Sequence, residues 1–506
     1  MSKEYSRSKK LFLNSGSSLV FQITTVICGF ILPRIILNTY GSEVNGLVNS
    51  ITQFLSIIGF LEFGVGAVIQ SSLYKPIAEN DFVEISKIVH SGQKFFRKIA
   101  TILVVYVAVL VVFYPFLVNQ SFGWVYTATM IVALSVSSFA QYYFGVVDRL
   151  FLTANQRGYI QYNTQTITLI INTIACCILI KYGASIHMVK LTTSIIYLFR
   201  PLVLRLYVNK HYQIDRKIEY TGEPIKQKWN GLAQHVSAVV LDGTDNIVLT
   251  IFSTLSNVSI YSVYHMVVYN VKNLFTSSTQ GVHALLGELW AKKETKKLTE
   301  FFSLFEWALH TATVFIFCCC GVLIIPFVEV YTSGVTDVNY IQPAFAYIIT
   351  AANACHCLRI PYNSMILATG HYKQTQKNYI ISASINIVIS VVAVINFGLV
   401  GVAIGTLVAM LYQTVWMAWY VSKNLLERPL HIFIKHILVD VVCVACSFFA
   451  VSWIEMSSVS YLSWIIMAVE VAVICFAVIA VLNIILYRKI CCDGLRLVKD
   501  RLKRNK

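Results

Sequence analysis

Residues 461–487 are YLSWIIMAVEVAVICFAVIAVLNIILY, a run in which Glu470 is the only charged side chain. A helix that crosses a bilayer needs about 20 consecutive, mostly apolar residues, so this stretch is long enough to span a membrane. The chain contains about 14 runs of this kind. They are long and continuous, unlike the alternating segments of an outer-membrane barrel. The pattern therefore predicts an all-α polytopic membrane protein. The runs lie near 13–38, 44–70, 96–118, 124–147, 159–180, 185–208, 230–254, 258–289, 301–330, 341–367, 378–396, 400–421, 432–453 and 461–487.

The overall composition supports this fold class. Of the 506 residues, 57% are hydrophobic and only 13% are charged, whereas soluble domains carry roughly a quarter charged residues. So few charges cannot cover the surface of several water-soluble domains. The net charge of +16 leaves two interpretations, a nucleic-acid surface or basic loops on one side of a bilayer.

The distribution of the basic residues favours the second interpretation. With the N-terminus in the cytoplasm, 35 of the 40 Lys and Arg residues fall on the cytoplasmic side of the predicted helices. Only Lys181 and Lys190 fall on the extracytoplasmic side, and the other three basic residues lie within predicted helices. Cytoplasmic loops of membrane proteins are enriched in Lys and Arg. We therefore expect a multi-pass membrane protein with both termini in the cytoplasm and no nucleic-acid partner.

A weak internal repeat defines the expected domains. With an offset of 214 to 216 residues, segment 38–45 aligns with 252–259, and 152–157 aligns with 367–372. Six helices per repeat would give both halves the same orientation, with a pseudo-two-fold axis along the membrane normal and a central cavity that opens to alternate sides. The predicted parts are an N-terminal six-helix bundle (1–208), a basic cytoplasmic linker (209–228), a C-terminal six-helix bundle (229–423), two additional transmembrane helices (432–487) and a basic cytoplasmic tail (488–506).

Three basic residues, Arg34, Lys272 and Arg359, lie inside predicted membrane helices. An embedded charge costs at least about 2.5 kcal/mol unless it faces water or a partner, so each is a candidate functional residue. Pro33 and Pro361 lie close to two of them, and a proline that bends a helix commonly lines a cavity. Buried cations favour an anion, and the guanidinium fork suits phosphate. Alternatively, the cations pair with membrane acids, and Arg34 extends to the interface.

Acidic side chains form a second set of candidates. Asp242, Asp245 and Asn246 can share one helix face beside Gly243, where they could hold Na⁺ or a proton. The simpler explanation is an acid pair that neutralises Arg34 or Lys272. Four other membrane acids are isolated in the sequence, and we expect them only to pack helices or line a cavity. They are Glu62, Glu306, Asp440 and Glu470.

No catalytic motif is recognisable, so we expect no enzyme, no resident metal and no organic cofactor. Cys355, His356 and Cys357 are too close along one helix to direct their side chains at a single metal ion. The extracytoplasmic connections, such as 119–123 and 455–460, are too short to fold into a catalytic domain.

Several short motifs carry a family resemblance. They are Asn14-Ser-Gly-Ser-Ser18, Leu152-Thr-Ala-Asn-Gln-Arg-Gly-Tyr-Ile160, and Arg359-Ile-Pro-Tyr-Asn363 before Ala368-Thr-Gly370. With two six-helix bundles and two further helices, the chain resembles the polysaccharide exporters of the multidrug/oligosaccharidyl-lipid/polysaccharide (MOP) superfamily. The most similar branch is the Wzx-type lipid-linked oligosaccharide flippases.

The resemblance implies a substrate and a set of partners. The substrate would be an undecaprenyl-pyrophosphate-linked oligosaccharide for O-antigen-type or capsule-type polysaccharide. It would be moved from the cytoplasmic to the outer leaflet of a bacterial inner membrane. A polysaccharide polymerase and chain-length machinery would act with the flippase, in contact with membrane lipids. Lipid II flippases and multidrug or organic-cation antiporters of the same superfamily are the alternatives. Carried over to this chain, the resemblance assigns the phosphates to Arg34, Lys272 and Arg359, and coupling by Na⁺ or H⁺ to Asp242 or Asp245, Asn386 and Thr406.

Overall fold

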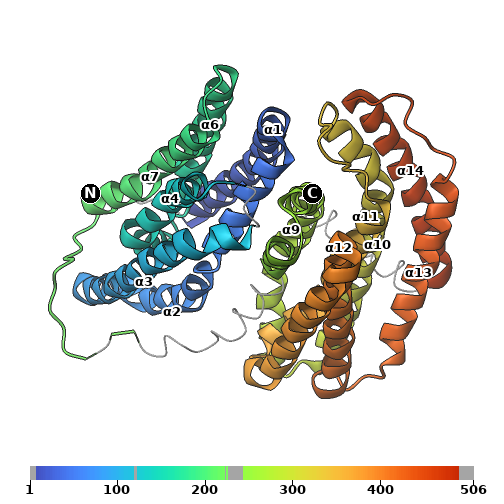
Figure 1. Cartoon of the computed structure of the whole chain (residues 1–506). Helices are drawn as coiled ribbons and strands as arrows, with labels where there is room; N and C mark the ends of the chain where they lie inside the picture. Colours follow the sequence, from blue (N-terminus) through green and yellow to red (C-terminus); the bar gives the residue numbers. More distant parts are fainter. Residues whose placement is uncertain (1–6, 119–121, 223, 226–242, 489–506) are drawn as a thin grey trace. The chain divides into compact units, whose positions relative to one another are not determined.

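The computed structural model describes residues 7–118, 122–222, 224–225 and 243–488 (Figure 1). Helices and short connections make up this part of the chain, and no strand occurs in it. The predicted all-α class is therefore confirmed. The helices are α1 (Arg7–Ser56), α2 (Gly59–Glu79), α3 (Phe82–Leu117), α4 (Trp124–Ala140), the π-helix η1 (Gln141–Gly145), α5 (Val146–Ala154), α6 (Tyr159–Lys181), α7 (Ile186–His211), α9 (Leu255–Ala291), α10 (Thr295–Tyr331), α11 (Pro343–Ala368), α12 (Tyr372–Asn424), α13 (His431–Val451) and α14 (Tyr461–Leu486). Residues 243–252 are also helical.

Two of these helices are each interrupted by a glycine. Gly41 divides α1 with φ 83° and ψ 175°, and Gly398 divides α12 with φ 51° and ψ −125°. Positive φ is strained for residues with a Cβ atom but open to glycine. The breaks fall between predicted runs 13–38 and 44–70, and between 378–396 and 400–421. Run 13–38 lies in the first part of α1, run 44–70 covers the rest of α1 and part of α2, and α12 accounts for the other two runs. In the described part of the chain each of the 14 predicted runs contains helix, and run 230–254 is described from residue 243 on.

Most helices have the length and composition of membrane spans. Within the described part of the chain, nine helical segments are long and apolar enough to cross a bilayer, and two of them contain the glycine breaks. The helical stretches outside this set are α2, α9, α11 and residues 243–252. The chain is a multi-span membrane protein.

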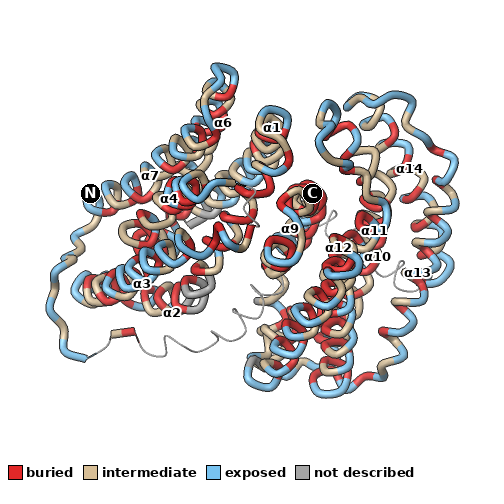
Figure 2. The backbone as a smooth tube through the Cα atoms, viewed as in Figure 1, coloured by how far each residue is buried: buried red, intermediate tan, exposed pale blue. Residues whose placement is uncertain are grey.

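The packing of α14 shows how these helices are built. Met467, Val471 and Cys475 are buried at a spacing of four residues, whereas Val473 and Phe476 on the other side are 62% and 63% exposed. A soluble protein would place polar residues on that exposed side. Figure 2 shows the same alternation of buried and exposed faces along the helices. The apolar outer face is suited to lipid.

The contacts divide the chain into two compact units, Met1–Ser259 and Ile260–Lys506. We call them unit 1 and unit 2. Unit 1 has one large hydrophobic core that includes Leu47, Ile51 and Phe96. In unit 2, separate clusters form around Phe302 and Tyr362 and at other helix contacts. Residues 243–252 fall in unit 1, and the six-helix grouping of each half stays a prediction.

Helix 243–252 packs within unit 1 through a polar contact. The hydroxyls of Ser50 and Thr250 lie 2.6 Å apart, and Tyr114 donates a hydrogen bond of 2.6 Å to Ser50. Gly46 permits a close approach nearby, because a Cβ atom there would lie 1.8 Å from the carbonyl oxygen of Leu255. Only glycine allows these backbones so close together.

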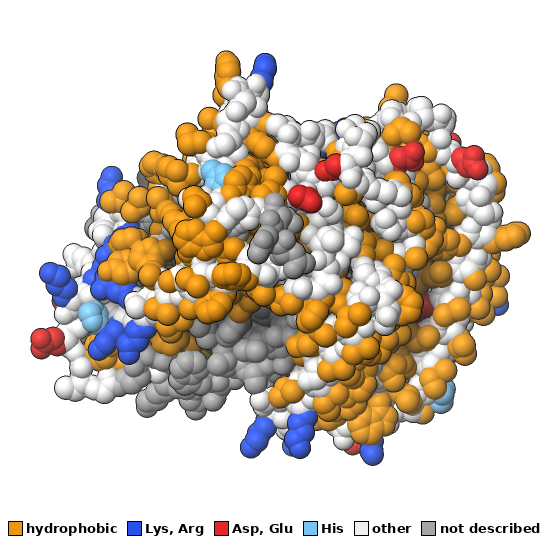
Figure 3. All heavy atoms as spheres, in the orientation of Figure 1, with side chains coloured by type: hydrophobic (Ala, Val, Ile, Leu, Met, Phe, Trp, Pro, Cys, Tyr) orange, Lys and Arg blue, Asp and Glu red, His pale blue; other side chains and the backbone are white. Residues whose placement is uncertain are grey.

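The surface of each unit separates charge from hydrophobic residues. Figure 3 shows hydrophobic side chains covering much of the visible helix surfaces, while most visible Lys and Arg side chains gather near helix ends. Such a distribution is typical of membrane proteins, in which basic residues flank the hydrocarbon region. The cytoplasmic placement of these ends stays a prediction.

Candidate functional site

Two of the three predicted phosphate-binding cations lie on helices of lower apolar content. Lys272 is on α9 and Arg359 is on α11, and neither helix is among the nine apolar spans of the described residues. Pro361 lies inside α11, two residues after Arg359. A helix that is less apolar than its neighbours is suited to line a polar path rather than to face lipid.

Unit 2 brings Lys272 and Arg359 together. Their exposed fractions are 5% and 8%, and both lie within electrostatic range of the Cys357 thiol. A terminal nitrogen of the Arg359 guanidinium, Nη2, lies 3.0 Å from Nδ1 of His356. The Lys272 ammonium lies 5.1 Å from the centre of the Tyr269 ring. Both cations were predicted separately from the sequence, and in the structure both lie near Cys357.

Apolar side chains surround this location. Cys357 belongs to a buried cluster with Phe275, Leu309, Phe317 and Ile360. In such surroundings the effective dielectric constant is low, so a positive charge acts more strongly on an anion than it would in water. The pair of cations can therefore bind an anionic group that enters without its full hydration shell.

An aromatic row on α9 leads to Lys272, and sequence analysis did not identify it. The ring of His265 stacks on Tyr261 at 5.2 Å between centroids and lies 5.3 Å from the ring of Tyr269. Tyr269 is 41% exposed. The spacing of four residues places these rings on one helix face, which is the signal in the sequence that could have revealed them.

Arg34 lies on α1 beside Pro33, at intermediate exposure. It belongs to unit 1, whereas Lys272 and Arg359 belong to unit 2. Each unit therefore contributes at least one predicted phosphate ligand, and the role of Arg34 stays a prediction.

The predicted cation ligands are divided in the same way. Asp242 lies outside the described residues. Asp245 is buried in unit 1, with 4% exposure. In unit 2 the Asn386 amide donates a hydrogen bond of 3.0 Å to the Thr406 hydroxyl, across the two halves of α12. The Asn386 carbonyl oxygen is buried and has no hydrogen bond within the described structure. Asn386 and Thr406 are thus in contact, and each carries a side-chain oxygen of the type that can bind Na⁺.

Three of the acids treated as isolated in the sequence have charged or titratable partners in the structure. Glu62 pairs with Arg149, Glu306 pairs with Arg428, and Asp440 pairs with His310. The sequence did not reveal any of these partners. Their partners lie 87, 122 and 130 residues away along the chain, too far for helical periodicity to reveal them.

Comparison with known proteins identifies the fold. No family model matches the sequence, and no curated protein matches it. Among solved structures, the lipid II flippase MurJ in an inward closed conformation is similar over 94% of this chain and 100% of that chain, with a TM-score of 0.71 and 16% identity.

Multidrug transporters share the same arrangement. An inward-facing multidrug resistance MATE family transporter of the MOP superfamily is matched over 79% of this chain and 95% of that one, with a TM-score of 0.57 and 13% identity. A MATE transporter from Vibrio cholerae, VcmN, is matched over 83% and 98%, with a TM-score of 0.59 and 12% identity. This chain therefore has the same fold as the MurJ flippase and the two MATE transporters.

Proposed function

We propose that this protein is a flippase that moves a polyprenyl-pyrophosphate-linked oligosaccharide from the cytoplasmic to the outer leaflet by alternating access, for cell-surface polysaccharide synthesis. The observation that supports the proposal most is the pair of buried cations, Lys272 and Arg359, around Cys357. A pyrophosphate group carries the negative charge that such a pair can bind. The fold shared with a lipid II flippase adds support.

In this proposal the two cations bind the phosphates and the aromatic row of α9 contacts the sugars. Arg359 would bind a phosphate through its planar guanidinium, and Lys272 would add a point charge. Tyr269 has exposed ring surface beside Lys272. An anion that leaves a negative cell interior gains about 2.3 kcal/mol per charge for each 100 mV, so the membrane potential can drive export.

A second part of the proposal concerns a coupling cation. Asn386 and Thr406 of unit 2 would provide oxygen ligands for Na⁺. The N386A variant should then lose any dependence of transport on Na⁺. If transport by the wild type is the same with and without Na⁺, this part is wrong.

A multidrug transporter is the competing function, since MATE transporters share the fold. Organic cations would be repelled by the buried charges of Lys272 and Arg359. Export of a fluorescent organic cation by cells that express the protein would support this alternative. A lipid II flippase would use the same two cations, because its substrate also carries pyrophosphate.

The proposed function is tested by removing both cations. The K272A/R359A double variant should not complement a flippase-deficient strain at normal membrane abundance. It should also bind undecaprenyl pyrophosphate at least about 10-fold more weakly than the wild type, because each hydrogen bond to a charged group contributes about 1.5–3 kcal/mol. The matched control is K190A, which removes a lysine from α7 in unit 1. Full complementation and unchanged binding by the double variant would contradict the phosphate site.

A further inference from the structure

A second group of buried titratable side chains lies where four elements of unit 2 meet. Arg428 precedes α13, and Tyr487 follows α14. We call the group the acid–histidine cluster. Its members from α10 are Glu306 and His310, from α11 Tyr362, and from α13 His436 and Asp440, with Arg428 and Tyr487 at its edges.

One end of the cluster is a bidentate ion pair between Arg428 and Glu306. The Arg428 guanidinium donates to both oxygens of Glu306, at 2.6 Å and 2.5 Å. The Tyr362 hydroxyl donates to the same carboxylate at 2.6 Å and lies 3.4 Å from Nε2 of His310. Glu306 is therefore held as a carboxylate by two donors.

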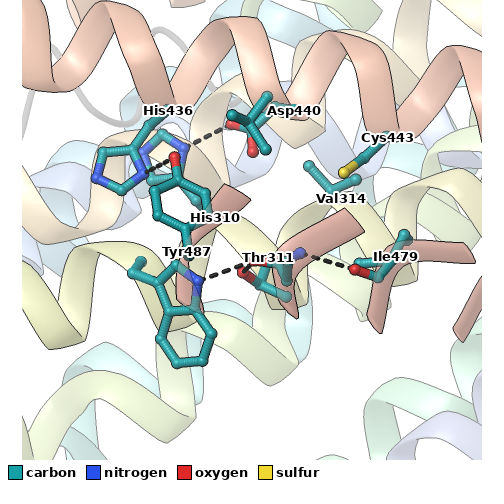
Figure 4. Close-up of a pocket in the computed structure, with 11 residues that line it drawn as sticks. His310, Thr311, Val314, His436, Asp440, Cys443, Ile479 and Tyr487 are labelled. Carbon is teal, nitrogen blue, oxygen red and sulfur yellow. Dashed lines mark hydrogen bonds and ion pairs between the residues drawn. The ribbon is translucent and has the colours of Figure 1, made fainter. Parts of the chain in front are cut away.

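The other end contains the two histidines, which Figure 4 shows beside Asp440 and Tyr487. His310 Nδ1 lies 2.6 Å from an Asp440 oxygen. His436 Nδ1 lies 2.8 Å from the Tyr487 hydroxyl, and its Nε2 lies 3.7 Å from Glu306. A chain of polar atoms thus runs from Asp440 through His310, Tyr362 and Glu306 to His436 and Tyr487.

The charges of this cluster do not balance without a proton. Glu306, His310, Arg428 and His436 have side chains that are at most 5% exposed, and Asp440 is 13% exposed. Two carboxylates face one guanidinium, so neutral histidines leave a net charge of −1. A buried net charge is costly. One proton on the histidines would make the cluster neutral.

Neighbouring groups do not remove this imbalance. Lys435 lies 4.9 Å from the Tyr487 ring centre, but its side chain is exposed and can be solvated. Cys443 on α13 and Asn483 on α14 line the same cavity and are uncharged in their ordinary state. The imbalance therefore belongs to the cluster itself.

A small cavity lies beside these two groups. Trp307, Thr311 and Asn483 line it together with His310 and Asp440. Its volume is about 10 Å³, close to the smallest volume that holds one water molecule. A single water molecule there would contact both His310 and Asp440 and could exchange a proton with them.

We propose that His310 and Asp440 together bind one exchangeable proton, and that this proton is a second coupling ion, distinct from the Na⁺ proposed at Asn386 and Thr406. On binding, a proton from water forms an N–H bond on the imidazole, and the imidazolium donates to the Asp440 carboxylate. On release, the same bond breaks and the proton returns to water. The coupling rests on the proposed function, whereas the binding of the proton does not.

The proton site is tested first without any substrate. Nuclear magnetic resonance of the full-length protein with ¹⁵N-labelled histidine reports imidazole protonation between about pH 5 and 8. The signal of His310 is the one that H310Q removes. In D440N the proton affinity of His310 should fall at least about 10-fold, because an opposite charge at hydrogen-bond distance favours the imidazolium. E470Q is the control, since Glu470 is an exposed acid on α14.

Two results of this experiment overturn the proton site. One is a His310 that stays neutral throughout the pH range, and the other is an unchanged titration in D440N. Asparagine retains an acceptor for His310 Nδ1–H, so D440N can fold with the same contacts. If H310Q does not fold, the signal of His310 is assigned instead by its change in D440N.

The coupling is tested with undecaprenyl pyrophosphate as the probe. Calorimetry in two buffers of different ionisation enthalpy gives the number of protons exchanged on binding. Wild type should exchange a fraction of one proton or more, and D440N should exchange none while it retains affinity for the probe. Binding without proton exchange in the wild type overturns the coupling and leaves the proposed function intact. Absence of binding contradicts the proposed function, and the resonance experiment still decides the proton site.

Discussion

The two units neutralise their buried acids in different ways. In the described part of unit 1, Glu62 pairs with Arg149 and Asp148 pairs with Arg216, so each of these acids has its own arginine. In unit 2, Glu306 pairs with Arg428, whereas Asp440 faces His310. Arginine is charged at every physiological pH. Histidine changes its charge near neutrality.

This difference separates two functions of buried charge. The pairs of unit 1 remain neutral at any physiological pH, so they can only hold helices together. The acid–histidine cluster of unit 2 can hold helices together and can also gain or lose a proton. Both units carry buried acids, and the identity of the basic partner decides which of them responds to pH.

The largest expected effect comes from breaking the ion pair at the centre of the cluster. E306Q removes the charge that balances Arg428, whose side chain is 5% exposed. Leaving one charge of a buried pair alone costs about 3–5 kcal/mol. Denaturant or thermal unfolding of the purified protein measures the loss. The control is E288Q, which breaks the exposed pair with Lys292 and should leave stability unchanged. If E306Q changed stability as little as E288Q, Arg428 would have to be solvated.

A double-mutant cycle compares the pairs directly. In unit 1 the E62Q/R149Q double variant should be less destabilised than the sum of the two single variants, by about 0.5–3 kcal/mol, because neither charge is left alone. In unit 2 the destabilisation of the E306Q/R428Q double variant should lie closer to the sum of its two single variants. The reason is that Tyr362 and His436 also lose their charged partner. Equal recovery in both units would contradict the distinction between isolated pairs and a shared cluster.

The second pair of unit 1 should act locally. Arg216 donates to Asp148 at 2.7 Å and to Asn209 at 3.0 Å, so it attaches the segment after α7 to α5. R216Q should increase proteolytic cleavage within residues 212–222 several-fold, because local opening becomes easier. K217Q is the matched control, since Lys217 is the exposed neighbour. Equal cleavage of the two variants would show that the ion pair does not hold this segment.

The smallest expected effect lies at the edge of the cluster. Y487F removes the hydroxyl that lies 2.8 Å from His436 Nδ1, and one neutral hydrogen bond contributes about 1 kcal/mol. The free energy of unfolding should therefore fall much less in Y487F than in E306Q. If Y487F lost as much unfolding free energy as E306Q, Tyr487 would be as important to the stability of the cluster as the Glu306–Arg428 ion pair.

Much of the fold could be predicted because it depends on local properties of the chain. Apolar runs of sufficient length predict membrane helices. The short gaps between predicted runs near Gly41 and Gly398 coincide with the positive-φ breaks in α1 and α12. Pro33 and Pro361, each close to an embedded arginine in the sequence, lie inside helices α1 and α11 as predicted.

The candidate sites could be predicted only in part. A cation in an apolar run is visible in the sequence, which is why Lys272 and Arg359 were selected. Their common location beside Cys357 depends on how α9 and α11 pack. Arg428 was counted among the basic residues of a loop, yet it is buried against Glu306. A charge near a helix end gives no local signal of a partner 122 residues away.

The sequence by itself determined the fold class, the number of helices and the helices that carry embedded charge. These follow from the cost of exposing polar groups to hydrocarbon, which acts on each segment separately. Only the tertiary structure decided which charges meet. His310, Asp440, Glu306 and Arg428 form one cluster because α10, α11, α13 and α14 pack side by side in unit 2. Electrostatic energy depends on distance in space, and distance in space is set by packing.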